Sequence, residues 1–222
     1  MTVATDRLLF VCLNPAWQRS VGFERFALAR VNRALNVCET GGGKGINAAR
    51  AARLLQADAT VAFFSGGTTG QLLRTELDAL GISRIDVSVD AATRVCTTII
   101  DHASGQVTEM IEPSGTVSDA AFGRLRARLL CQLSSFSGVA ICGTFPPRIP
   151  EDFYARLAGA ARAAGATVLL DGVKGLDPAL KQGLDILRLN ADELRAVTGE
   201  SELHRALHHP TVAGGCRWLA VT

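Results

Sequence analysis

The sequence predicts an α/β fold in which helices cover both faces of a parallel β-sheet. Three observations favour this class. Short apolar runs alternate with helical patterns along most of the chain. The 222 residues allow one large domain or two small ones with a substantial buried core. Hydrophobic residues make up 48% and charged residues 20%, which is ordinary for a globular protein.

In the first 90 residues, strand-sized apolar runs surround two helical patterns. LLFVCLN, ATVAFF and IDVSV are the apolar runs. GINAARAARLLQ places Ile46, Ala49, Arg53 and Leu54 on one mixed helix face, and GQLLRTELDALGI ends at a stop signal, Gly81. We therefore expect strands at 8–14, 59–64 and 85–89 and helices at 45–56 and 70–82.

The second half of the chain continues the alternation. Ser118 is a candidate N-cap for a helix, and Gly199 is expected to stop another. We expect helices at 118–133, 151–164, 176–184 and 191–199, and strands at 138–143, 166–171, 185–190 and 216–222.

Two segments, 19–39 and 94–111, do not fit this alternation. Both look extended, with alternating polar residues, and the second reads as a hairpin with Gly105 in its turn. The simplest interpretation is a small β layer beside the α/β core.

Composition argues against several function classes. The formal net charge is +2 and no basic run stands out, so neither a nucleic-acid surface nor a lipid surface is expected. No apolar stretch approaches membrane-spanning length, and the N-terminus lacks the order of a secretory signal, so we expect a cytoplasmic protein. The six cysteines form no C-x-x-C pair and the four histidines lack metal-ligand spacing, which predicts free, buried thiols and no such metal site.

The stretch TGGGKGINAAR at 40–50 is the most unusual part of the sequence. It fails as a P-loop because Gly45, which carries no hydroxyl for Mg²⁺, follows Lys44. Residues 43–48 match the relaxed G-x-G-x-x-A dinucleotide pattern, but they lie far from the first strand and the next strand ends without an acid. A glycine-rich turn opening a helix remains, either as a ligand cradle or as a tight turn with an exposed lysine.

Four motifs in order resemble the ribokinase-like (PfkB) carbohydrate kinases. They are LNPAWQ at 13–18, similar to the opening strand of the 1-phosphofructokinase and tagatose-6-phosphate kinase branch, GGGKGINAARAARLL, ICGTFPP at 141–147 and RLNADEL at 188–194. The resemblance implies one kinase domain over 1–222, with a three-layer α/β/α core and a β lid from the segments 19–39 and 94–111. It also implies transfer of a phosphoryl group from ATP to a sugar phosphate with Mg²⁺, and a homodimer formed through the lid.

The resemblance also assigns roles to individual residues. Gln18, Gly42, Gly43, Asn47 and Thr144 would contact the sugar, with Lys44 beside them. Arg94 would bind the phosphate that the sugar already carries, since a guanidinium can bind phosphate bidentately; the alternative is a solvated lid arginine.

On the nucleotide side, Arg188 would face the ATP phosphates, and Asn190 and Glu193 would order Mg²⁺ and its waters. Asp171 is a weaker candidate for the metal shell. The sequence permits an equally simple alternative, in which Asn190 caps a helix and Glu193 is a first-turn acid.

The sequence departs from the family pattern at two places. Gln18 stands where the phosphosugar branch usually has Asp, which leaves the preferred sugar open. The G-A-G-D segment that carries the family's catalytic base is absent, so we expect the base, and the C-terminal part of the fold, beyond Thr222. Two hypotheses follow: an N-terminal portion of a hexose-phosphate kinase that is inactive alone, or a naturally short, non-catalytic protein that binds a sugar phosphate.

Overall fold

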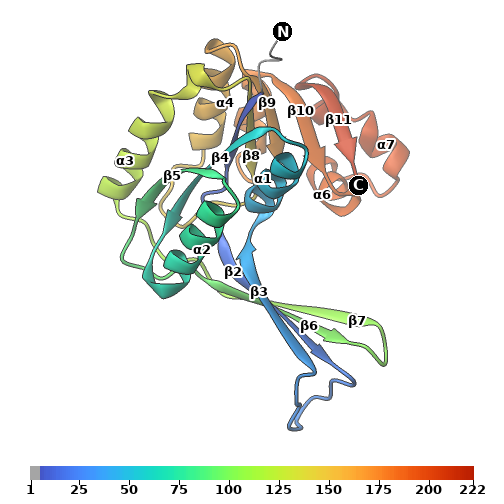
Figure 1. Ribbon diagram of the computed structural model, residues 1–222. Coiled ribbons are helices and arrows are strands. Elements are labelled where there is room, and N and C mark those ends of the chain that lie inside the picture. The colour runs from blue at the N-terminus through green and yellow to red at the C-terminus, as the bar shows by residue number, and fades with distance from the viewer. Residues whose placement is uncertain (1–5) are drawn as a thin grey trace.

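The computed structural model describes residues 6–222 and has an α/β fold with two sheets (Figure 1). Within these residues, the main sheet has seven strands in the order β11-β10-β9-β8-β1-β4-β5, and every neighbouring pair is parallel. The predicted fold class is confirmed. The strands are β1 Arg7–Val11, β4 Asp58–Ser65, β5 Ser83–Ser88, β8 Gly138–Cys142, β9 Thr167–Asp171, β10 Leu184–Leu189 and β11 Cys216–Val221.

Helices lie on both faces of the main sheet. The helices are α1 Lys44–Leu54, α2 Gly67–Ala79, α3 Asp119–Leu130, α4 Phe153–Ala163, α5 Leu176–Gln182, α6 Ala191–Thr198, α7 Leu203–Leu207 and α8 Pro210–Ala213, with a 3₁₀ turn at Leu133–Ser135. Successive residues of β1 serve opposite faces because side chains alternate along a strand. Leu9 and Val11 join the core under α3 and α4, whereas Phe10 joins the core under α1 and α2.

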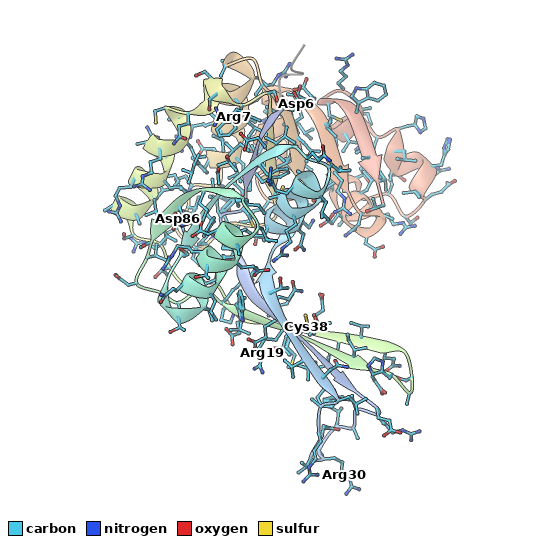
Figure 2. All side chains as sticks on the ribbon, in the orientation of Figure 1. Asp6, Arg7, Arg19, Arg30, Cys38 and Asp86 are labelled. Atoms are coloured by element: carbon cyan, nitrogen blue, oxygen red, sulfur yellow. The ribbon has the colours of Figure 1, made fainter. Side chains whose placement is uncertain are left out.

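The second sheet projects from this core (Figure 1). Its four strands, in the order β3-β2-β6-β7, are β2 Ala16–Phe23, β3 Asn36–Gly42, β6 Val95–Asp101 and β7 Gln106–Ile111. Strands β6 and β7 form the predicted hairpin, and Gly105 takes a positive φ of 71° in its turn. Arg19 and Cys38 lie on this sheet, and Arg30 lies at its far tip (Figure 2).

Several predicted boundaries differ from the structure. The expected strand at 8–14 ends at Val11, and the motif at 13–18 is a turn that leads into β2. Segment 19–39 is not continuously extended, because residues 24–35 between β2 and β3 form neither strand nor helix. Leu54, which we expected on the mixed face of its helix, is 85% exposed.

The remaining differences concern helices. The helix expected at 118–133 ends at Leu130, while its predicted cap is confirmed: Ser118 Oγ accepts from Ala121 N at 3.2 Å. Helices α7 and α8 were not predicted, since both are too short to show a clear period. No helix within residues 6–222 has the length and apolar character needed to cross a membrane.

Candidate functional site

A pocket of about 400 Å³ lies where the carboxyl ends of β1 and β8 meet the second sheet. In parallel α/β sheets, ligands bind at this edge. Six residues proposed from the sequence line the pocket: Gln18, Gly43, Lys44, Asn47, Arg94 and Thr144. They come from four separate segments of the chain, and the fold brings these segments together. Gly42 is buried beside the pocket, where an added Cβ would lie 2.5 Å from Gln18 Oε1.

The glycine bend, residues 41–45, is packed closely against the protein's own cysteines. Gly43 takes φ 117°, which favours glycine, and an added Cβ there would lie 2.9 Å from Cys12 Sγ. At Gly45 an added Cβ would lie 2.7 Å from Cys12 Cβ and 3.4 Å from Cys142 Cβ. The glycines are therefore needed to seat α1 on β1 and β8, in addition to any contact with a ligand.

Cys12 also lies near the first backbone amides of α1. The N–H groups of Gly45 and Ile46 act to lower the pKa of the Cys12 thiol. Burial nevertheless raises the pKa of the Cys12 thiol, because these amides and the charge of Arg94 do not offset the loss of water. Burial likewise raises the pKa of Cys142 far above its ordinary value. Both thiols are free and buried, as predicted, whereas Cys38 and Cys131 are exposed, so the prediction of buried thiols is wrong for those two.

The ion pair between Arg50 and Glu76 holds the glycine bend in place and orients Asn47. Glu76 of α2 accepts hydrogen bonds from Thr40 Oγ1 at 2.6 Å and from the backbone N–H of Gly41. Arg50 Nη2 donates to Glu76 Oε1 at 2.7 Å, while Arg50 Nη1 donates to Asn47 Oδ1 at 3.0 Å. Because Asn47 Oδ1 is engaged by Arg50, its amide nitrogen is left for the pocket.

Arg94 is anchored at the pocket wall by backbone carbonyls. Its Nη2 donates to Asn14 O at 3.2 Å and its Nη1 donates to Glu112 O at 3.4 Å. Its Nε is buried and has no hydrogen-bond partner among residues 6–222. A buried donor without a partner costs about 1–3 kcal/mol. Nη1 and Nη2 each carry a second N–H beyond the one given to a carbonyl, and these are the donors left for a ligand.

Lys44 lines the pocket beside the proposed sugar residues, and its amino group contacts two acids. Its Nζ lies 2.9 Å from Asp171 Oδ1 and 3.3 Å from Glu193 Oε1, so it links the glycine bend to the end of β9 and the first turn of α6. Arg188 Nη1 lies 3.1 Å from the same Asp171 oxygen. Partial burial of Lys44 lowers its pKa, because it disfavours the charged form. The carboxylates of Asp171 and Glu193 have the larger combined effect and raise the pKa of Lys44 above 10.5.

Asn190 and Glu193 form a capping box at the start of α6. Glu193 N donates to Asn190 Oδ1 at 2.7 Å, and Asn190 N donates to Glu193 Oε2 at 2.9 Å. Asn190 therefore caps the helix and Glu193 is a first-turn acid, which is the alternative that the sequence permitted. Within residues 6–222 no three His, Cys, Asp or Glu side chains are grouped so as to hold a metal ion. Asp171 and Glu193 contact the pocket residue Lys44 directly, while Arg188 contacts Asp171 and Asn190 contacts Glu193.

The sequence analysis missed several pocket residues, of which Glu109 is the most informative. Strand pairing places Gln18 beside Cys96 and Cys96 beside Ile111, so these residues share one face of the second sheet. Glu109, two residues before Ile111, shares that face and lines the pocket. Its carboxylate has no ion pair or hydrogen bond among the described residues. Side chains alternate between the two faces of a strand, so the predicted hairpin could have placed Glu109 on the same face as Ile111.

Asn14 is a second missed residue. It follows β1, and its Nδ2 donates to Thr144 Oγ1 at 3.1 Å. Tyr154 OH donates to the backbone carbonyl of Thr144 at 3.3 Å. Thr144 is thus held from two sides at the carboxyl end of β8.

Comparisons with known proteins agree with the fold and with the motifs. The model of the pfkB family of carbohydrate kinases matches residues 12–222. Tagatose-6-phosphate kinase of Staphylococcus epidermidis is 26% identical over 97% of this chain and 71% of its own length.

Solved structures give a similar result. Phosphofructokinase-2 of Escherichia coli, in complex with fructose-6-phosphate, superposes with a TM-score of 0.82 at 22% identity, over 98% of this chain and 74% of that one. A possible 1-phosphofructokinase of Thermotoga maritima has a TM-score of 0.77 at 28% identity, over 82% of this chain and 59% of that one.

Proposed function

The chain belongs to the pfkB family of carbohydrate kinases, and on this premise we propose that it binds a ketohexose phosphate for phosphorylation by ATP. Fructose 1-phosphate, fructose 6-phosphate and tagatose 6-phosphate are the candidate substrates. The names of the relatives support this class, since they include a tagatose-6-phosphate kinase and a phosphofructokinase-2 solved with fructose-6-phosphate. The observation that carries the proposal is that Arg94 and the glycine bend line one pocket.

In this proposal each pocket residue contacts a particular part of the sugar phosphate. Arg94 binds the existing phosphate, because its Nη1 and Nη2 each keep a second N–H and phosphate can accept hydrogen bonds from both. Asn47 and Gln18 offer amides to the sugar hydroxyls, and Thr144 offers its hydroxyl. Gly42 and Gly43 keep the wall free of side chains, so the sugar can approach the backbone.

The nucleotide side of the proposal rests on the oxygen donors at the ends of β9 and β10. Mg²⁺ prefers oxygen ligands and commonly binds through one or two carboxylates together with substrate phosphates. Asp171 and Glu193 fit that pattern in kind, while Lys44 occupies one oxygen of each. Asp171, Asn190 and Glu193 would therefore hold the ion mainly through water, and Arg188 would face the phosphates. Mg²⁺ bound with ATP neutralises charge on the transferring phosphoryl group.

Transfer also needs a base for the attacking hydroxyl. The G-A-G-D segment that supplies it in the family does not occur in these 222 residues. We propose that the base lies outside this chain and that these residues alone bind the sugar phosphate with almost no turnover, since general-base catalysis contributes roughly 10²–10⁴ in rate. A sugar-phosphate-binding protein without catalysis is the alternative, and the same pocket would serve it.

We further propose a homodimer formed through the second sheet. Apolar side chains that are at least half exposed lie on both faces of its two outer strands: Val107 and Ile111 on the pocket face, Val37 and Met110 on the other. Exposed apolar side chains that cluster on a surface often mark a protein interface. Sedimentation equilibrium of the wild type and of Val107→Asp tests this: a monomeric wild type would contradict the proposal.

Calorimetric titration with the three sugar phosphates tests the substrate class. Binding of at least one of them, with free fructose binding more weakly, is the expected result. Arg94→Ala should lose most of this binding, whereas Arg126→Ala, on the exposed side of α3, should retain it. No binding of any phosphorylated ketose by the folded wild type would contradict the proposal.

A further inference from the structure

Two cysteines stand next to each other at the floor of the pocket. Strands β1 and β8 are parallel neighbours in which Val11 lies opposite Ile141, so the next residues along each strand are Cys12 and Cys142. A single point above Gly45, where a Cβ would stand, is 2.7 Å from Cys12 Cβ and 3.4 Å from Cys142 Cβ. Both residues line the pocket, and neither forms a disulfide. The fold therefore presents a pair of thiols to whatever enters the pocket.

The sulfur atoms of these two cysteines favour one class of metal ion. Thiolate sulfur is a soft donor that prefers soft ions such as Cu(I) over hard ions such as Mg²⁺. A structural zinc site needs four ligands. The described residues provide no third Cys, His, Asp or Glu in the same group. A pair of thiolates without further ligands therefore suits Cu(I), which accepts two-coordinate binding.

The surroundings offset part of the charge of such a centre. Two thiolates and one Cu(I) carry a net charge of −1. Arg94 and the backbone amides of Gly45 and Ile46 favour negative charge at Cys12, and Lys44 and Arg188 favour it at Cys142. Burial of both thiols and the charge of Asp171 act in the opposite direction. Because Cu(I) replaces the two thiol protons, the bound ion itself supplies the remaining compensation.

We propose that Cys12 and Cys142 form a two-thiolate site for Cu(I) at the floor of the pocket. Two S–H bonds break and release two protons to solvent, two Cu–S bonds form, and copper stays in the +1 state. The ion occupies the floor of the same pocket that holds the sugar in the proposed function. Cu(I) and the sugar phosphate therefore exclude each other, although Cu(I) binding itself does not depend on that function.

The test is an anaerobic Cu(I) titration of the full chain against the chromogenic chelator bicinchoninate. The wild type should withdraw one equivalent of Cu(I) from the chelator. Cys12→Ser and Cys142→Ser should each weaken binding by more than the roughly 10–100-fold typical of losing an outer-shell partner. Circular dichroism melting of each variant establishes that it is folded.

Cys96→Ser is the matched control, because Cys96 lines the same pocket from the second sheet. Cys131→Ser controls for an exposed thiol. Both should bind like the wild type. Undiminished binding by Cys12→Ser or Cys142→Ser, or an equal loss in Cys96→Ser, would overturn the two-thiolate assignment.

X-ray absorption spectroscopy of the wild type with Cu(I) bound identifies the atoms that coordinate the copper, and this measurement needs no variant. Two sulfur neighbours and no nitrogen or oxygen neighbour are expected, and any other first coordination shell would overturn the proposal. Failure of Cu(I) binding together with intact sugar-phosphate binding would leave the proposed function standing. The two proposals are thus separable in one set of samples.

Discussion

Lys44 Nζ lies 2.9 Å from Asp171 Oδ1, although the two residues are 127 positions apart in the chain. This ion pair joins the start of α1 to the end of β9, and so connects the residues proposed for the sugar with those proposed for the nucleotide. Glu193 completes the contact at 3.3 Å. The bend that carries Gly43 and Asn47 is thus tied directly to the acids proposed for the metal.

Replacing Lys44 should cost little stability at neutral pH. Its side chain is 36% exposed, so solvent screens the pair, and we expect Lys44→Met to lower the free energy of unfolding by about 1 kcal/mol or less. Lys181→Met, at an exposed position of α5, should have no measurable effect. Urea denaturation measures both, and a loss of several kcal/mol would show that the pair is a major structural element.

The contribution of Lys44 to the free energy of unfolding should decrease at high pH. The folded-state pKa of Lys44 is raised above 10.5. Its stabilisation is therefore fully present below the unfolded value of 10.5 and is lost as pH rises through the folded value. The difference in unfolding free energy between wild type and Lys44→Met should stay constant from pH 7 to 9 and shrink above 10.5. A difference that grows with pH would contradict this assignment.

The Arg50–Glu76 pair should control the affinity for the sugar. Glu76→Gln weakens the hold on Gly41 and on Arg50, which orients Asn47, so the bend loses its fixed shape. We expect sugar-phosphate binding to fall by roughly tenfold, since a hydrogen bond to a charged group is worth about 1.5–3 kcal/mol. Asp78→Asn removes an ion pair of the same helix away from the bend and is the control in the calorimetric titration. Equal effects of the two changes would rule out a specific positioning role.

Gly45→Ala should destabilise the fold. The added Cβ would lie 2.7 Å from Cys12 Cβ, and overpacking of this kind costs about 1–3 kcal/mol. Gly123→Ala in α3 is the matched control, because nothing lies within 4 Å of its added Cβ. That change should stabilise the protein by up to about 1 kcal/mol, the usual gain in a helix interior. Thermal and urea unfolding of the two variants should move in opposite directions.

Glu109 should contribute to the affinity for the proposed sugar phosphate. Its unpaired carboxylate lines the pocket on the wall that also carries Gln18, and a carboxylate can accept hydrogen bonds from hydroxyls. Glu109→Ala is expected to weaken sugar-phosphate binding by about tenfold, as for loss of one charged hydrogen bond. Thr108→Ala changes the neighbouring residue, which points to the opposite face of β7, and should bind normally. Unchanged affinity in Glu109→Ala would remove Glu109 from the binding site.

The sequence by itself determined the order and kind of most elements. Apolar runs and helical periods depend on neighbouring residues, and so do caps: Ser118 and the Asn190–Glu193 box satisfy backbone groups within three positions of each other. The motifs also placed Gln18, Asn47 and Thr144 in one family pattern, the family resemblance added Arg94, and the fold puts all four in one pocket.

Only the tertiary structure decided which distant residues meet. The strand order puts β1 beside β8, so Cys12 meets Cys142 and both fill the space under Gly45. It also turns Lys44 toward Asp171 and sets Glu109 on the pocket face of the second sheet. These contacts join segments that lie from dozens to more than a hundred residues apart, and no local pattern encodes such a pairing, because it depends on how the sheets close.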